Sequence, residues 1–252
     1  MSYKMTYRGL TSDTYSLVIT HVNRSAGPYV ENITVDIPRH AGSLPVRVDD
    51  RGRLIRVDFA LLTDDLEDMR DKVESLADWI RPVIDENNIP QAEELIFGDA
   101  PARKWLAYPV GQTPLDEAIK LGRGYIDFFC PSPYAYALSQ EVKTVDGENN
   151  GTEPTPPIIE VTVTKGAGIA DLKVQLDGTD KFLLIDGPFP DATKIIFNKE
   201  TRLVTVDGTD ARVDLHYGSR WFDIPAGDYE IVTTPVTGVD VATIVKFTER
   251  WR

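Results

Sequence analysis

A polar segment near the middle of the chain limits the fold more than any other feature, because it cannot take part in a hydrophobic core. From Asp146 to Pro157 the sequence has no aromatic or aliphatic residue and is rich in glycine, proline and asparagine. Its prolines favour extended backbone, and such a composition is typical of an interdomain linker. The alternative is a long loop within one domain, although structureless loops of this length are uncommon inside compact domains. We therefore predict a linker over residues 139–157 that joins two domains, 1–138 and 158–252.

The first predicted domain is rich in strands. From Arg53 to Leu61 apolar and polar residues alternate, which predicts a half-buried strand. Residues 113–117 fit either a short second helix or a loop, and Asp49–Gly52 is expected to form a turn. Further strands are expected at 33–37, 104–110 and 125–130.

One main helix is also predicted in this domain. Helical spacing of apolar residues indicates that it begins near Thr63 and stops at Arg81 and Pro82. Asp64 is the expected N-cap, with Glu67 as its capping-box partner. The expected core face consists of Leu66, Met69, Val73, Leu76 and Ile80.

The second predicted domain consists of strands, because its sequence shows no sustained helical period. Short runs rich in β-branched residues alternate with turn signals such as the Asp-Gly pairs at 177, 186 and 207. The fold class is therefore α+β in the first domain, β-rich with one main amphipathic helix, and an all-β sandwich of jelly-roll or lectin-like type in the second. The predicted strands are Ile159–Val163, Leu172–Leu176, Lys194–Asn198, Leu203–Val206, Arg212–Tyr217, Tyr229–Thr233 and Thr243–Thr248.

Motifs of the common enzyme classes are absent from the sequence. There is no glycine-rich phosphate loop with lysine, no Gly-x-Ser-x-Gly elbow and no His-Glu-x-x-His pair. The three histidines, His21, His40 and His216, lie far apart in sequence. A glycosidase needs only two carboxylates across a cleft and stays the enzymatic alternative. The adjacent pairs Asp49/Asp50 and Asp64/Asp65 have ordinary uses in a turn and a helix cap, so we predict no enzyme activity and no catalytic residue.

Metal and cofactor sites are not predicted either. Asp177/Asp180 and Asp207/Asp210 have the spacing of loop ligands for calcium, but the acidic pattern of an EF-hand is missing. A lone cysteine, Cys130, leaves no disulfide and no cysteine-based zinc cluster. The aromatic residues of the second domain, Trp221 among them, are expected to form its core, although exposed ones would be able to stack on sugar rings.

Charge and hydropathy restrict the partners. The 252 residues include 27 Lys and Arg against 40 Asp and Glu, which gives a net charge of −13. Sequence-specific binding of nucleic acid is not expected of so acidic a chain, because phosphate binding depends on Lys and Arg. No apolar run approaches the roughly 20 residues that span a bilayer, and no secretory signal is visible. We expect synthesis in a cytoplasm and no membrane insertion.

Four stretches, taken in order, carry a family resemblance. Gly42 leads through Arg51-Gly52-Arg53 into the predicted strand, and the acidic helix closes with Trp79-Ile80. A segment from Gly124 to Tyr136 follows, and then the run Trp221–Ile231 with a closing basic and aromatic strand near residue 251. In this order the chain resembles the distal tail (Dit) proteins of siphophages, in the short form with a galectin-like C-terminal domain.

The resemblance implies a structural role at the distal end of a phage tail. In such proteins the N-terminal domains of six copies close a ring, single or stacked in two layers, between the tail-tube protein and the tail-tip protein. The C-terminal domains project outward, where some relatives hold receptor-binding proteins, and the genome passes through the channel. Synthesis would take place in the host bacterial cytoplasm. A carbohydrate-binding module that attaches to cell-wall glycans through the C-terminal sandwich is the alternative.

Overall fold

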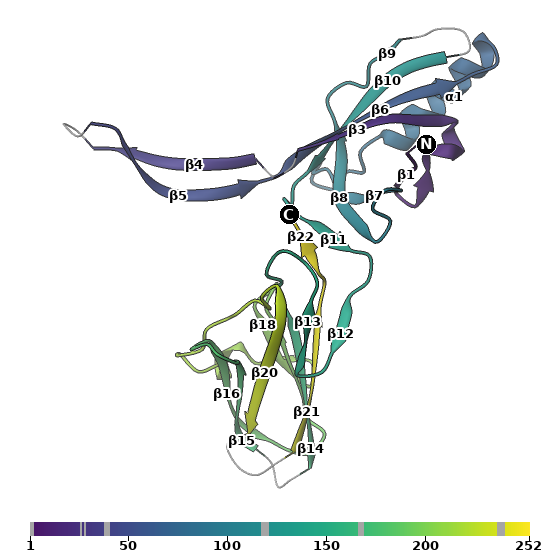
Figure 1. The fold of residues 1–252 in the computed structure, drawn as a ribbon. Coiled ribbons are helices and arrows are strands. Elements are labelled where there is room, and N and C mark those ends of the chain that lie inside the picture. The colour runs from purple at the N-terminus through teal and green to yellow at the C-terminus, as the bar shows by residue number, and fades with distance from the viewer. Residues whose placement is uncertain are drawn as a thin grey trace. The chain divides into compact units, whose positions relative to one another are not determined.

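Two units make up the chain in the computed structural model. The first contains residues 1–138 together with Arg252, and the second contains residues 139–251. Figure 1 shows strands in both units and the α-helix in the first. The structure describes residues 3–25, 27, 29–37, 41–116, 121–165, 169–235 and 240–252.

Antiparallel pairs build the main sheet of the first unit, in the order β2-β1-β7-β8-β10-β6-β3. Ile55, Val57 and Phe59 of β6 are all buried, so the alternation predicted for this strand is confirmed. The strands predicted at 104–110 and 125–130 lie within β8 and β10. The bounds are β1 Met5–Tyr7, β2 Leu10–Thr11, η1 Ser12–Tyr15, β3 Leu17–Arg24, β6 Arg53–Leu62, β7 Glu93–Phe97, β8 Arg103–Val110, β10 Leu121–Cys130 and β11 Ala135–Ala137.

Helix α1 (Leu66–Ile80) has its N-cap one residue later than expected. Its N-cap is Asp65 rather than Asp64, since the Asp65 side chain accepts a hydrogen bond from the Asp68 N–H at 2.9 Å. The Asp68 side chain accepts from the Asp64 N–H at 2.8 Å. Asp68 therefore takes the capping-box role predicted for Glu67, because both members of the box move by one position.

The buried face of α1 differs partly from the predicted one. Met69 and Leu76 are buried as expected, but Leu66 is exposed and Trp79 is buried instead. The Trp79 indole N–H donates to the Tyr7 carbonyl at 3.1 Å, and its ring stacks on Tyr15 at 4.5 Å. A buried ring of this size with a satisfied donor anchors the C-terminal end of the helix, whereas Leu66 in the first turn lies outside the core.

A separate two-stranded sheet, β4 (Tyr29–Asp36) with β5 (Ser43–Arg51), projects from the main sheet of the first unit (Figure 1). The expected turn at Asp49–Gly52 is wrong, because Asp49 and Asp50 belong to β5. The predicted strand 33–37 covers only the end of β4. Residues 113–117 also differ from both expectations, since Leu115–Asp116 form the short strand β9 against β10. Glu117 lies outside the described residues.

The second unit contains two antiparallel sheets. One runs in the order β12-β21-β14-β17-β18-β19 and the other in the order β13-β20-β15-β16. Their inward-facing side chains, such as Val161, Val174 and Phe197, form one hydrophobic core, which agrees with the predicted all-β sandwich. The bounds are β12 Glu141–Lys143, β13 Asp146–Asn149, β14 Ile158–Lys165, β15 Ile169–Leu176, β16 Phe182–Phe189, β17 Lys194–Asn198, β18 Leu203–Val206, β19 Thr209–Asp210, β20 Gly227–Pro235, β21 Asp240–Phe247 and β22 Arg250–Trp251.

The segment predicted as a linker, 139–157, requires a correction. It carries β12, which pairs with β21, and β13, which pairs with β20, so it extends both sheets of the second unit. Buried Asn149 holds it further, since its side-chain amide donates to the Pro225 carbonyl at 3.0 Å. Backbone hydrogen bonds and one buried amide thus attach a segment that has no aromatic or aliphatic side chain from Asp146 to Pro157.

Two smaller predictions in the second unit are also wrong. Arg212–Tyr217 is not a strand, because it begins with the 3₁₀ helix η2 (Arg212–Asp214) and continues as a loop. Asp186 and Gly187 do not form a hairpin turn and instead lie inside strand β16. Within the described part of the chain, no helix combines the length and the apolar character needed to cross a membrane.

Candidate self-association surface on the β4–β5 hairpin

The strand register sorts the side chains of the β4–β5 hairpin onto two faces. Val30 is opposite Asp50 and Asn32 is opposite Val48, so these four residues share one face. The other face carries Glu31 opposite Asp49, with Tyr29 opposite Arg51 on the same side. A shift in register between Ile33 and Thr34 marks an irregularity nearer the tip.

Apolar side chains of the hairpin are exposed on an unusual scale. Tyr29 is 68% exposed, Val46 is 63% exposed and Val48 is 60% exposed. An isolated two-stranded hairpin is at best marginally stable in water, and clustered exposed apolar side chains mark interaction sites. We call the hairpin and its exposed apolar residues the arm. Its exposed large apolar residues are Tyr29, Val30, Val35, Ile37, Leu44, Val46 and Val48.

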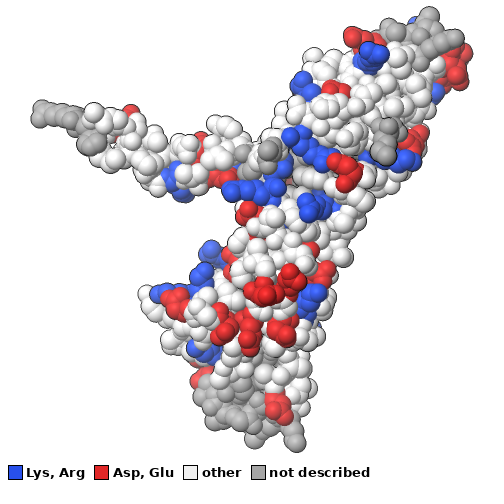
Figure 2. All heavy atoms as spheres, in the orientation of Figure 1, with Lys and Arg blue, Asp and Glu red and all other residues white. Residues whose placement is uncertain are grey.

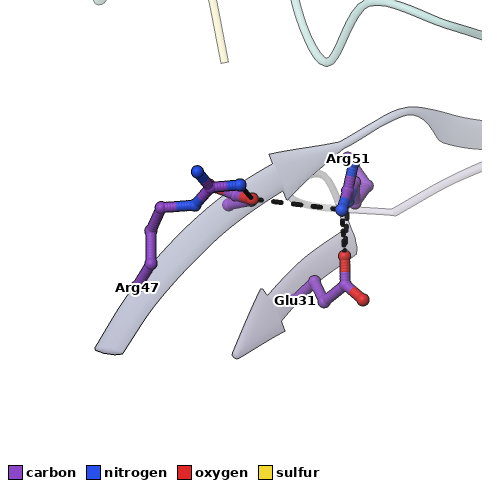
Figure 3. A network of polar contacts seen from close by, with 4 residues as sticks. Glu31, Arg47 and Arg51 are labelled. Atoms are coloured by element: carbon purple, nitrogen blue, oxygen red, sulfur yellow. Dashed lines mark hydrogen bonds and ion pairs between the residues drawn. The ribbon is translucent and has the colours of Figure 1, made fainter. Parts of the chain in front are cut away.

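An ion-pair network stiffens one face of the arm (Figure 3). The Arg51 guanidinium lies 2.5 Å from a Glu31 carboxylate oxygen and 3.9 Å from Asp49, while Arg47 lies 2.5 Å from Asp49. Two cations and two anions cancel, so this face presents paired charges rather than a net field. The Arg51–Glu31 pair links β5 to β4 across the ladder.

The sequence carried a signal for the arm that the prediction missed. Leu44, Val46 and Val48 alternate with Pro45, Arg47 and Asp49, which is the period of a strand. The predicted strand at 33–37 covered part of β4 but left β5 without an assignment. The apolar residues of this hairpin are exposed, so the alternation in its sequence does not correspond to packing against a core within the chain.

The histidines and acid pairs considered as catalytic candidates do not converge on one site. His21 lies on β3 of the first unit, and His216 lies in an exposed loop of the second, where its Nδ1 accepts from the Gly218 N–H at 3.1 Å. His40 lies outside the described residues. Asp49 and Asp50 are neighbours on β5 and therefore point to opposite faces of the arm. Asp64 and Asp65 start α1.

The acids considered for calcium are engaged in turns and ion pairs. Asp180 lies 2.7 Å from Arg220, and Asp210 lies 2.6 Å from Arg212, which lowers the pKa of the Asp210 carboxyl. Asp207 accepts a hydrogen bond from the Lys194 N–H at 2.8 Å. Among the described residues, no group of three or more His, Cys, Asp or Glu side chains is placed to hold a metal ion.

Cys130, the one thiol of the sequence, is buried in the first unit. Burial raises the pKa of the Cys130 thiol to about 12, so the sulfur stays protonated at neutral pH. A protonated, buried thiol is a poor nucleophile and a poor metal ligand.

Aromatic residues of the second unit form its core with one prominent exception. Phe197, Phe222 and Phe247 are buried, and Trp221 is partly buried against the same core. Tyr217, in contrast, is fully exposed at 103%.

Acidic side chains gather on one face of the second unit in Figure 2. A hollow of about 670 Å³ in this unit is lined by five acidic residues and one basic residue, Lys181. A surface of this sign repels phosphate groups. The acids that line it are Asp146, Asp177, Asp223, Asp228 and Glu230.

Two family models match the chain. One, described as the C-terminal domain of a siphovirus-type tail component, matches residues 150–251. The other, described as a phage tail protein RIFT-related domain, matches residues 13–130. Together they span most of both units. Among curated proteins no match is found.

The fold is similar to that of a solved phage protein over its full length. The crystal structure of the SPP1 Dit protein (gp 19.1), described as a paradigm of hub adsorption apparatus in phages that infect Gram-positive bacteria, is 18% identical with a TM-score of 0.80 and 100% coverage of both chains. A chain of the phage P2 baseplate in its activated conformation with Ca is 9% identical, with a TM-score of 0.46 and coverage of 98% of this chain and 97% of that one. The form with Sr is 10% identical, with a TM-score of 0.40 and 97% coverage of both.

Proposed function

The chain belongs to the distal tail (Dit) family of siphophage tail components, and on this premise we propose that it forms the ring that joins the end of the tail tube to the tail tip. The family is structural, and the protein is a component of the phage tail. Six copies, in one ring or in two stacked rings, would leave a central channel for the genome. The ring would lie at the distal end of the tail, after synthesis of the chain in the host bacterial cytoplasm.

The exposed arm is the observation that carries the ring proposal. Val48 and the other apolar residues of the arm are exposed in the single chain, and in the proposed ring a neighbouring copy would cover them. Burying one valine of this kind contributes roughly 1.5 kcal/mol or more. In a cyclic ring each copy offers one patch to the next and receives a different patch from the previous copy, so six arms would be covered without leaving an open end.

Different units of the chain would meet different partners. We propose that the first unit, 1–138, forms the ring and contacts the tail-tube protein and the tail-tip protein. The second unit, 139–251, would be the adaptor that receives a receptor-binding protein. Its sandwich is compatible with a galectin-like shape, and shape alone assigns no ligand.

The test compares the solution mass and the electron micrographs of the wild type with those of arm variants. Val30→Asp and Val48→Asp place charges on one face of the arm, so we expect rings for the wild type and monomers for both variants. Val213→Asp is the matched control, because Val213 is 91% exposed in the second unit and lies outside the arm. Variants that assemble as the wild type does would refute the role of the arm.

A second function, carbohydrate binding, is favoured by one observation, the fully exposed ring of Tyr217. Sugar rings stack on exposed aromatic faces, whereas Trp221, the residue first considered for this role, packs partly against the core. A glycan array probed with the full chain separates the two functions. Saturable binding that is lost in Tyr217→Ala would support the carbohydrate function, and absence of binding to any glycan would oppose it.

A further inference from the structure

At the root of the arm lies a hollow of about 710 Å³ that contains two arginines and no acid among its described lining residues. Tyr29 and Arg51 contribute from the arm, and Arg53 and Phe129 contribute from β6 and β10. Arg51 is already paired with Glu31. Arg53 is therefore the residue whose charge needs an explanation.

Arg53 points inward, because it has the same strand parity as buried Ile55 and Val57. Arg53 is only 6% exposed. Nε and Nη2 are buried, and neither has a hydrogen-bond partner among the described residues. Cys130, its cross-strand neighbour, offers only a protonated thiol. Leaving a buried guanidinium unpaired is costly, since desolvation is then not offset by any attraction.

The side of the Arg53 guanidinium that carries Nε and Nη2 is the side by which other arginines of this chain bind carboxylates. Arg56 holds the two oxygens of Asp127 with the same pair of atoms, Nε and Nη2, at 2.8 Å each. Arg212 holds Asp210 in the same way, with Nε 3.0 Å from Oδ1 and Nη2 2.6 Å from Oδ2. Guanidinium and carboxylate match as two parallel hydrogen bonds, which is the strongest form of this pairing.

We infer that Arg53 receives an Asp or Glu carboxylate from a neighbouring copy of this chain when that copy covers the root of the arm. This inference rests on the proposed ring. The hollow is continuous with the arm through Tyr29 and Arg51, so the partner that buries the arm also reaches Arg53. The charges of the two copies would be complementary, since the hollow has two arginines and no acid among its described lining residues, and each copy carries a net charge of −13. Because Nε and Nη2 are shielded from water in the single chain, the incoming carboxylate must part the side chains that cover them.

Gly52 keeps the wall of this hollow in place. A Cβ at Gly52 would lie 2.5 Å from the Cys130 carbonyl oxygen and 2.8 Å from Cζ of Phe129. Only glycine allows β5 to run into β6 at this distance from β10, and the close approach sets Arg53 beside the root of the arm.

The experiment measures association of the full-length chain by sedimentation velocity, with the thermal midpoint of the dilute chain as a check on folding. Arg53→Met keeps the volume and removes the charge, so it should fold at least as well as the wild type and associate roughly 30-fold more weakly or worse. Arg53→Lys keeps the charge without the planar fork and should fall between them. Arg212→Met, at an exposed ion pair of the second unit, is the control and should associate as the wild type does.

Each outcome decides between the alternatives. Association of Arg53→Met at wild-type strength overturns this inference and leaves the ring proposal intact. A wild type that stays monomeric at its highest soluble concentration overturns both. Inorganic phosphate added to the dilute chain tests a free anion as the occupant: a thermal midpoint that rises for the wild type and not for Arg53→Met would replace the neighbouring copy with a small anion and overturn the inference.

Discussion

At the scale of single residues, many charged side chains of this chain are held by specific partners, in contrast to Arg53. Glu160 is the clearest case outside the arm. Its carboxylate lies 2.6 Å from Lys246 and 2.9 Å from Lys194. The three residues come from neighbouring strands, where diagonal positions on one face of the sheet lie within reach of long side chains.

The two lysines lower the pKa of Glu160, chiefly through the hydrogen bond from Lys246. In the unfolded chain the pKa of a glutamate is about 4.3. A carboxyl whose pKa is lower in the folded state stabilises the fold above the unfolded pKa, and this stability is lost as the pH falls through the folded pKa.

Glu160→Gln should therefore lower the free energy of unfolding by roughly 1 kcal/mol at neutral pH, a value that allows for the partial exposure of both lysines. The difference should vanish in acid, once the wild-type carboxyl is protonated. Calorimetry of the full chain at both pH values measures it. Asp210→Asn, at an exposed pair, is the control and should change stability little. A difference that persists in acid would mean that packing, not charge, causes it.

Among elements, the strands that bury one face were predictable from the sequence and the others were not. In β6 the apolar residues Ile55, Val57, Phe59 and Leu61 are buried at every second position, and in β17 Ile195 and Phe197 are, because one face of each strand lies on a core. The helix was predictable for the same reason, although Trp79 and not Leu66 carries its burial. β13 has three polar residues and a glycine, and backbone pairing with β20 decides its structure, which no side-chain pattern reveals.

The candidate site was only partly predictable, for a related reason. Val46 and Val48 follow the period of a strand, but both side chains are exposed in the single chain, and only the proposed ring would bury them. Arg53 has the parity of the core residues of β6, a signal that a charged residue points inward. Sequence alone does not tell whether such a charge finds its partner within the chain.

The corrected role of residues 139–157 has a consequence for fragments of the chain. β12 and β13 cover the edges of β21 and β20, and exposed strand edges promote aggregation. A fragment 139–252 should therefore be soluble and unfold in one cooperative transition. A fragment 158–252 should aggregate or unfold at a lower temperature. Light scattering and circular dichroism measure both properties, and equal behaviour of the two fragments would restore the linker interpretation.

For the whole molecule, the charge is best understood together with the proposed channel. The net charge of −13 would keep DNA away only where acids are not outweighed by unpaired cations. Many cations of the described surface are paired with acids, for example Arg51 with Glu31, Arg220 with Asp180 and Lys104 with Glu94. Paired cations release few counterions from DNA, and counterion release drives binding to phosphates. A conduit made of such a chain would let DNA pass without holding it.

This proposal predicts the salt dependence of DNA binding by the assembled protein. Cationic proteins bind DNA more tightly as salt is lowered, whereas an acidic channel wall should repel it more strongly as the screening length grows. We therefore expect no retardation of duplex DNA at about 0.15 M salt and none at about 0.01 M. Electrophoretic mobility of labelled DNA, with rings verified by electron microscopy, measures this. Retardation that appears only at low salt would reveal an unpaired cationic surface in the ring and would contradict an acidic channel.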